Sequence, residues 1–206
     1  DVCAALGNSL KIGLISTAVA TILGTLIAFA LGRYAFKGRT FVNTLIFLPM
    51  ATPEVVMGAS LLTLFLTFGN HFAIFNPGFW TIIIAHIMFC ISFVVVTVKA
   101  RIASLDPRLE QAAMDLYANE RETFRKVTLP LVAPGIAGAA LLAFSLSFDD
   151  FIITNFNSGS FNTFPKFIYT TAQRGLPAQA NVIGVSMFLI AIIVVLGTQY
   201  ISRRKA

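Results

Sequence analysis

The chain has 206 residues, of which 57% are hydrophobic and only 12% are charged. Soluble domains are about 45–50% apolar and about 25% charged, so this composition and a mean hydropathy of +0.82 exclude an ordinary soluble domain and indicate a membrane protein. The net charge is +6, from 15 basic and nine acidic residues. Because the basic residues gather at the ends of apolar runs, this charge indicates orientation in a lipid bilayer rather than nucleic-acid binding.

Five apolar runs, separated by polar segments, predict an all-α, polytopic membrane protein with five transmembrane helices. A helix needs roughly 20 residues to cross the hydrocarbon core. The predicted spans cover residues 12–31, 41–68, 80–98, 129–148 and 182–201. We treat residues 1–206 as one membrane domain, with segment 99–128 as a loop within it.

Small residues recur at every fourth position along one face of the first predicted span. These residues are Ser16, Ala20, Gly24, Ala28 and Gly32. Small side chains at this spacing allow a second helix to approach closely. The first span is therefore expected to pack tightly against another span.

Two prolines, Pro49 and Pro53, interrupt the second predicted span, and Glu54 follows the second of them. Proline removes a backbone hydrogen bond and kinks a helix. Irregular backbone at membrane depth persists only inside protein or beside a water-filled cavity. The sequence therefore predicts a broken helix in one of these two environments.

His86 and Cys90 lie one helical turn apart in the third predicted span. This spacing could hold a metal ion, but no third ligand lies nearby in the sequence. We therefore predict a hydrogen-bonded core histidine and no metal site. Cys90 and Cys3 are both interpreted as small hydrophobic residues.

Segment 99–128 is polar and charged, although apolar runs flank it on both sides. Asp106 is placed to cap a helix that begins near Pro107 and continues to about residue 116. The apolar stripe of this helix has three- and four-residue spacing and consists of Leu109, Ala112, Ala113 and Leu116.

A second short helix is predicted after a turn near residues 118–119, and it carries Phe124 and Val127. Two short helices with a bend form a compact unit, which we interpret as a docking element for a soluble protein. A helix that lies on lipid and a loop that packs only on itself are the alternatives.

Three acidic residues, Glu54, Asp149 and Asp150, lie near the other ends of their spans, and Phe148 and Phe151 flank the aspartates. An ionised carboxylate within a span costs about 2.5–3.5 kcal/mol on insertion scales, so it usually faces a cavity or a partner. Carboxylates among aromatic faces suit a flexible cation with ammonium groups. Adjacent helical residues point about 100° apart, so one aspartate is expected to face a substrate path and the other to cap, pair or face a partner. Alternatively, all three acids lie in wet loops without a specific role.

The basic residues predict the orientation of the chain. Twelve of the 15 lie in the loop after the first span, in segment 99–128 or in the tail, and the other three are Lys11, Lys166 and Arg174. Basic residues mark cytoplasmic loops. Segment 99–128 and the C-terminus are therefore predicted to be cytoplasmic, and the start of the chain and the three acids to lie towards the outside.

The polar loop resembles the coupling motif of ABC importer permeases, which has the pattern L-E-x-A-A-x-D-L and, after a gap, F-x-x-V-x-L-P. The matching residues here are Leu109, Glu110, Ala112, Ala113, Asp115, Leu116, Phe124, Val127, Leu129 and Pro130. The resemblance implies that this segment docks in a groove of an ATP-hydrolysing subunit, whose closure then moves the membrane helices.

One residue departs from the family pattern. The family usually has glycine at the position of Tyr117, where glycine would permit a left-handed backbone. With tyrosine there, Asn119 is a nearby candidate for a positive φ angle. Tyr117 is included among the residues that the resemblance assigns to coupling.

A similarity to the second permease subunit of spermidine/putrescine importers extends over essentially the whole chain. It is carried by the segments RYAFKGRTF, LPMATPEVVMGASLLTLF, HIMFCISFVVVTVKARI and LAFSLSFDDFIITNF. The resemblance implies polyamine import by alternating access across a bacterial inner membrane. It also implies six spans, of which the first is missing from this sequence.

The same resemblance implies the partners of the chain. They are a dimer of ATP-binding subunits, a second permease subunit and an extracytoplasmic solute-binding protein. The sequence contains no P-loop motif, so this chain is expected to be neither an ATPase nor otherwise catalytic, and to hold no cofactor of its own. ATP and Mg would be bound by the partner ATPase.

Three other functions fit part of the pattern. An ABC importer for another cargo, such as ferric iron, would keep the mechanism. Sulfate is a less suitable cargo, because acidic residues in the path would repel an anion. A passive channel would not need the coupling motif. An intramembrane aspartyl protease needs two facing carboxylates, normally from separate helices, but Asp149 and Asp150 are adjacent.

Overall fold

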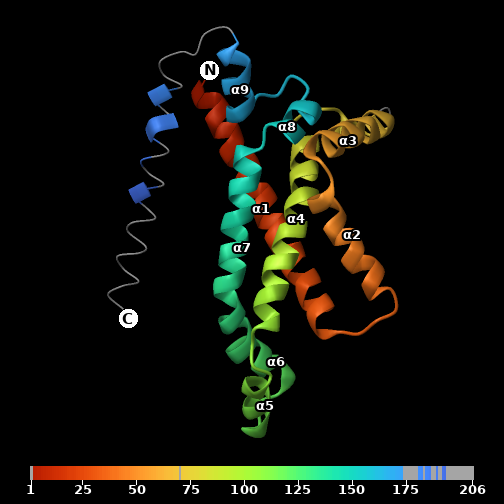
Figure 1. Cartoon of the computed structure of the whole chain (residues 1–206), viewed down its shortest axis with the longest axis vertical. Coiled ribbons are helices and arrows are strands. Elements are labelled where there is room, and N and C mark those ends of the chain that lie inside the picture. Colours follow the sequence, from red (N-terminus) through yellow and green to blue (C-terminus); the bar gives the residue numbers. More distant parts are fainter. Residues whose placement is uncertain are drawn as a thin grey trace.

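The structure is a computed structural model that describes residues 2–69 and 71–173 and, beyond them, only isolated positions between 181 and 193. Three long helices, α1 (Val2–Arg33), α4 (Phe79–Ala103) and α7 (Leu129–Asp149), run along its long axis (Figure 1). The other elements are α2 (Arg39–Ala51), α3 (Glu54–Gly69), a 3-10 turn (Ala73–Phe75), α5 (Arg108–Asp115), α6 (Glu120–Thr123), a π-helical segment (Phe124–Thr128), α8 (Ile152–Asn157) and α9 (Phe164–Ala172).

The three long helices pack against one another and form the core. The predicted small-residue face of α1 is confirmed for Ser16, Ala20, Gly24 and Ala28, which are buried, whereas Gly32 is exposed. A Cβ atom on Gly24 would lie only 2.7 Å from Cγ1 of Val94 on α4. The absence of a side chain therefore allows α1 and α4 to approach closely.

We expect Gly24→Ala to lower the free energy of unfolding by about 1–3 kcal/mol, because the new methyl group would overlap the stiff, branched side chain of Val94. Gly7→Ala is the matched control on the same helix, since a Cβ there meets nothing within 4 Å. Alanine at that position should leave stability unchanged or raise it by up to about 1 kcal/mol. Thermal unfolding of the purified transporter in detergent would compare the two variants.

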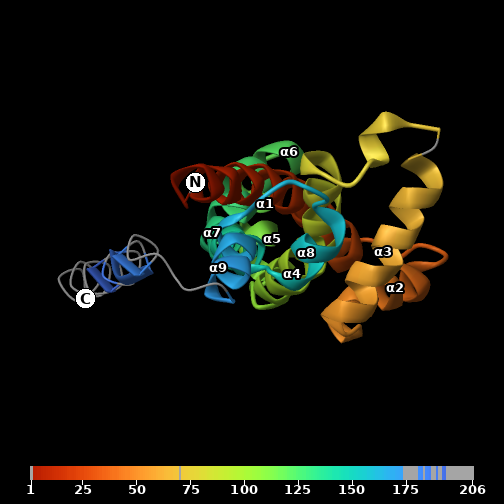
Figure 2. The same ribbon diagram turned by 90° about the horizontal axis from the view of Figure 1, so that it is seen from above.

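The second predicted span is bent rather than merely kinked. Helices α2 and α3 meet at an angle of 109°, with Thr52 and Pro53 at the break. Thr52 is extended (φ −84°, ψ 131°), as expected for a residue that precedes proline. Figure 2 shows α2 and α3 to one side of the three-helix core. The predicted break is confirmed, and it places Glu54 in the first turn of α3.

The described residues contain three helices that are long and apolar enough to cross a membrane, or four if the bent α2–α3 pair is one span. The three are α1, α4 and a continuous helix from Glu120 to Asp149 that includes α6, the π-helical segment and α7. The predicted last span, 182–201, lies outside the described residues apart from a few positions. Helices α5 and α6 lie at one end of the core, and α8 and α9 at the other (Figure 1).

Candidate functional site

The polar segment forms two short helices, as predicted from the sequence, and we call residues 108–123 the α5–α6 loop. The carboxylate of Asp106 accepts a hydrogen bond from the backbone N–H of Arg108 at 2.9 Å, at the start of α5. Asn119 and Glu122 form a capping box at the start of α6, with each side chain accepting from the backbone N–H of the other residue at 2.9 and 3.3 Å. Local hydrogen bonds thus define both helix starts.

The turn between the two helices has the geometry that a glycine usually supplies. Tyr117 has φ +63°. The N–H of Ala118 bonds the carbonyl of Ala113 at 3.1 Å, and the N–H of Tyr117 bonds that of Met114 at 3.0 Å, which together make a Schellman motif. The expectation of a positive φ at Asn119 is wrong, because this residue caps α6 with an extended backbone (φ −75°, ψ 167°).

We expect Tyr117→Gly to stabilise this turn by about 1 kcal/mol, because glycine has no Cβ that conflicts with a left-handed backbone. The amides of residues 113–118 should exchange about fivefold more slowly with deuterium in Tyr117→Gly than in Tyr117→Ala, since both variants lack the exposed ring and only alanine keeps a Cβ. Hydrogen-exchange mass spectrometry of the assembled transporter, with Tyr117→Ala as the control that keeps a Cβ, would measure this. Equal exchange rates in the glycine and alanine variants would show that a Cβ at residue 117 does not strain the turn.

The tip of the α5–α6 loop is apolar and exposed. Leu116 is 81% exposed and Tyr117 is 98% exposed. Ala112 and Asp115 are also exposed, whereas Glu110 and Ala113 are half-buried. No residue of α5 is fully buried. Exposed apolar side chains that are gathered at one tip are typical of a protein-binding surface.

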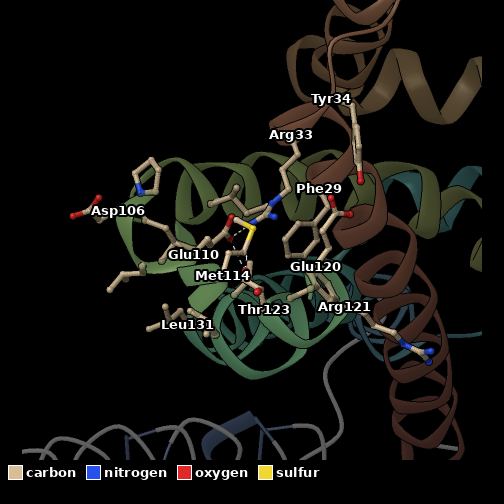
Figure 3. Close-up of a pocket in the computed structure, with 17 residues that line it drawn as sticks. Phe29, Arg33, Tyr34, Asp106, Glu110, Met114, Glu120, Arg121, Thr123 and Leu131 are labelled. Carbon is tan, nitrogen blue, oxygen red and sulfur yellow. Dashed lines mark hydrogen bonds and ion pairs between the residues drawn. The ribbon is translucent and has the colours of Figure 1, made fainter. Parts of the chain in front are cut away.

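The inner side of the loop lines an open pocket of about 770 Å³ (Figure 3). It lies between the end of α1 and the α5–α6 loop, and Arg33, Glu110, Met114, Thr123 and Phe124 are among its lining residues. Leu109 also lines it, so part of the predicted apolar stripe faces inward. Leu129 and Pro130 begin α7 immediately beyond the loop, and both are exposed.

Glu110 is held by residues from two other elements. Its Oε1 accepts hydrogen bonds from the guanidinium of Arg33, at the end of α1, and from the hydroxyl of Thr128, just before α7. Burial raises the pKa of Glu110. The hydrogen bonds from Thr128 and Arg33 and the charge of Arg33 together lower it by more, so the pKa lies below its ordinary value. The stabilisation is therefore present above the unfolded pKa of about 4.3 and disappears as the pH falls through the lower folded pKa. At neutral pH these contacts are fully formed.

A second, acidic cavity of about 390 Å³ lies at the α8 end of the core. It is lined by Glu54, Phe89, Ser145, Leu146, Asp149, Asp150, Phe151 and Ile152. Glu54 and Asp149 are both exposed. The structure thus brings together the three acids that the sequence analysis singled out, although Glu54 is about 95 positions from the aspartates.

The two adjacent aspartates have different environments. The side chain of Asp150 is only 4% exposed, and it accepts hydrogen bonds from the backbone N–H groups of Ile153 (3.3 Å) and Thr154 (2.8 Å). It also lies 3.2 Å from Nε2 of His86. Asp150 therefore caps α8 and contacts α4, as expected for one member of the pair. The role of Asp149 in a substrate path stays a prediction.

The flanking phenylalanines also differ. Phe151 lines the acidic cavity and packs on Tyr169 of α9, with ring centroids 4.3 Å apart. Phe148 stacks on Phe144 at 5.8 Å and is not among the lining residues. Of the two aromatic residues predicted to line a path, the structure thus brings only Phe151 to this cavity.

His86 is a hydrogen-bonded core histidine, which confirms the interpretation of its position in the third predicted span. It is 1% exposed. Its Nδ1 lies 2.7 Å from the hydroxyl of Ser147, and its Nε2 lies 3.0 Å from the hydroxyl of Thr154. Sequence reasoning missed Ser147 and Thr154, because these partners come from α7 and α8 and carry no local signal.

Comparisons with known proteins agree with this architecture. Residues 20–206 match the protein family described as "Binding-protein-dependent transport system inner membrane component". The chain is 38% identical over 199 residues to the spermidine/putrescine transport system permease protein PotC of Escherichia coli (strain K12), covering 96% of this chain and 74% of that protein. It is also 38% identical over 182 residues to the putrescine transport system permease protein PotI of the same organism, covering 86% and 64%.

Two solved structures share the fold. An amino acid ABC transporter has a TM-score of 0.72 at 16% identity, with 100% of this chain and 94% of that chain covered. A bacterial alginate ABC transporter, in complex with an alginate-bound periplasmic protein, also has a TM-score of 0.72, at 21% identity and with 98% and 78% covered. With the family match over most of its length and its long apolar helices, the chain belongs to the inner-membrane permease components of binding-protein-dependent transport systems.

Proposed function

We propose that this chain is a permease subunit of an ATP-driven polyamine importer and forms half of the translocation path by alternating access. The observation that carries the cargo assignment is the acidic cavity, which is lined by the exposed residues Glu54 and Asp149 and also by Phe151. The names of the relatives PotC and PotI support the same cargo class.

The chemistry of this cavity suits a flexible organic cation. Carboxylates attract ammonium groups, and aromatic faces add cation–π attraction. The carboxylate of Asp150 already contacts the backbone N–H of Thr154 in α8 and the ring of His86. Glu54 and Asp149 therefore remain as the acids that can contact a substrate. Two carboxylates in one cavity match a cargo with two or more separated amines.

The α5–α6 loop is the proposed docking element for a dimer of ATP-binding subunits. Its exposed tip, Leu116 and Tyr117, would enter a groove of one ATP-binding subunit, which supplies the ATP and Mg site. We further propose that the loop and the C-terminus are cytoplasmic, that the acidic cavity lies towards the outside, and that this sequence contributes five spans. A second permease subunit and an extracytoplasmic solute-binding protein complete the importer.

Uptake competition tests the cargo. Cells that lack other polyamine importers and express the assembled transporter should take up labelled spermidine. Excess unlabelled putrescine or spermidine should reduce this uptake at least about tenfold, and excess ferric citrate, sulfate or amino acids should leave it within about twofold. Uptake of labelled iron, with no uptake of spermidine, would contradict the polyamine assignment and favour ferric iron.

A further inference from the structure

A charged residue of the proposed coupling motif lies inside the permease rather than at the tip of the α5–α6 loop. The side chain of Glu110 is 26% exposed, whereas Leu116 and Tyr117 are 81% and 98% exposed. The Oε1 atom of Glu110 accepts hydrogen bonds from Arg33 on α1 and from Thr128, which directly precedes α7 (Figure 3). One carboxylate oxygen therefore connects α1, α5 and the base of α7.

A second contact joins the same region of α1 to the same segment. The ring of Phe29 on α1 meets that of Phe124 edge-on, with centroids 5.2 Å apart and an interplanar angle of 70°. The guanidinium of Arg33 lies 5.7 Å from the centroid of Phe29, so the aromatic and ionic contacts adjoin each other.

Both contacts fall on the π-helical segment. Phe124 is its first residue and Thr128 is its last. A π-helical turn interrupts the regular α hydrogen-bond ladder and frequently marks a functional site. Here it lies between α6 and α7, within the continuous helix from Glu120 to Asp149. This irregular segment is the covalent connection between the α5–α6 loop and α7.

We propose that Arg33, Glu110 and Thr128 form an internal joint that makes the α5–α6 loop and the end of α1 move as one body and transmits this motion to α7. Glu110 and Arg33 are then positioning residues for coupling, and Glu110 is not a contact of the ATP-binding subunit. This inference rests on the proposed coupling function of the loop.

The geometry separates docking from transmission. The exposed apolar tip is free to bind a partner, while the opposite side of α5 is fixed to the membrane helices through Glu110. Hydrogen bonds that involve ionised groups are roughly twice as strong as neutral ones. Lysine keeps the positive charge but has no planar guanidinium, so we expect Arg33→Lys to lower coupling less than Arg33→Met does.

The test uses the assembled transporter, reconstituted in lipid, and measures spermidine imported per ATP hydrolysed. Arg33→Met and Glu110→Gln should each lower this ratio about tenfold, and the double variant should be no worse than either single one. The affinity for the ATP-binding subunit should stay within about twofold. The matched control is the exposed pair of Lys126 and Glu122 in the same region, and Lys126→Met should keep the ratio within about twofold.

Two further measurements keep the test decisive. Thr128→Val preserves the shape of a fully buried side chain but removes its hydroxyl, and it should lower the ratio, whereas Thr128→Ser should not. Spin labels at Ala35 and Gln111, both exposed, should give one narrow distance with and without ATP, and a broad one in Arg33→Met. The label distance does not depend on the cargo.

Three outcomes would overturn the joint. One is weaker binding of the ATP-binding subunit to Glu110→Gln but not to Arg33→Met, which would make Glu110 a docking contact. The second is an Arg33→Met transporter with unchanged coupling. The third is an unchanged label distance in Arg33→Met. A wild-type complex with a narrow label distance and no spermidine import would instead contradict the proposed cargo and support the joint.

Discussion

Asp149→Asn is expected to lower spermidine uptake about 10- to 100-fold without reducing the amount of assembled transporter. Asp149 is exposed and lines the acidic cavity, so its carboxylate is available to a cationic substrate. A hydrogen bond to a charged group contributes about 1.5–3 kcal/mol, which corresponds to this range of rates. Initial rates of labelled spermidine uptake, normalised to transporter in the membrane, measure the effect.

Asp150→Ala is the matched comparison, because the next residue has the same chemistry in a different environment. It should lower the free energy of unfolding by about 1–3 kcal/mol, since two backbone N–H groups at the start of α8 and the ring of His86 lose their acceptor. Its main effect should therefore be a lower melting temperature and less assembled protein. Wild-type uptake by Asp149→Asn would show that this acid lies outside the path.

Leu116→Asp should abolish ATP-driven uptake, with a loss of at least about 100-fold, while the chain still inserts in the membrane. Leu116 is 81% exposed at the tip of the α5–α6 loop, so the change breaks no internal packing. Burying an unpaired carboxylate in an apolar groove costs several kcal/mol. Co-purification of the ATP-binding subunit and uptake of labelled spermidine are the two readouts.

Gln111→Asp is the control for this prediction. It adds the same charge to the same loop, at an exposed position on α5. It should keep both binding and uptake within about threefold of the wild type. If Leu116→Asp binds the ATP-binding subunit normally, the tip is not the docking surface.

Features that depend on local sequence were predictable. The apolar runs predicted α1, α4 and α7, and the prolines predicted the break between α2 and α3. The capping role of Asp106 follows from its position just before a helix, and the four-residue spacing of small side chains predicted the packing face of α1. Each of these features depends on residues within a few turns of one another.

Features that depend on contacts between elements were not predictable. Arg33 and Glu110 are 77 positions apart, and each is unremarkable in its own segment. His86 meets Asp150 only because α4, α7 and α8 converge, and the angle of 109° between α2 and α3 depends on how each packs on other helices. Tyr117 has a left-handed backbone although it carries a Cβ, because two backbone hydrogen bonds stabilise the turn. Residue preferences alone do not predict that these bonds outweigh the steric cost.

The most direct test of the central claim is spermidine accumulation by the purified transporter in proteoliposomes. The ATP-binding subunits face the ATP-containing side, and the solute-binding protein is on the other side. We predict accumulation of labelled spermidine against its gradient with ATP, and none with ADP or with Leu116→Asp. Equal spermidine flux with and without ATP, stopping at equilibrium, would contradict the account and indicate a passive channel.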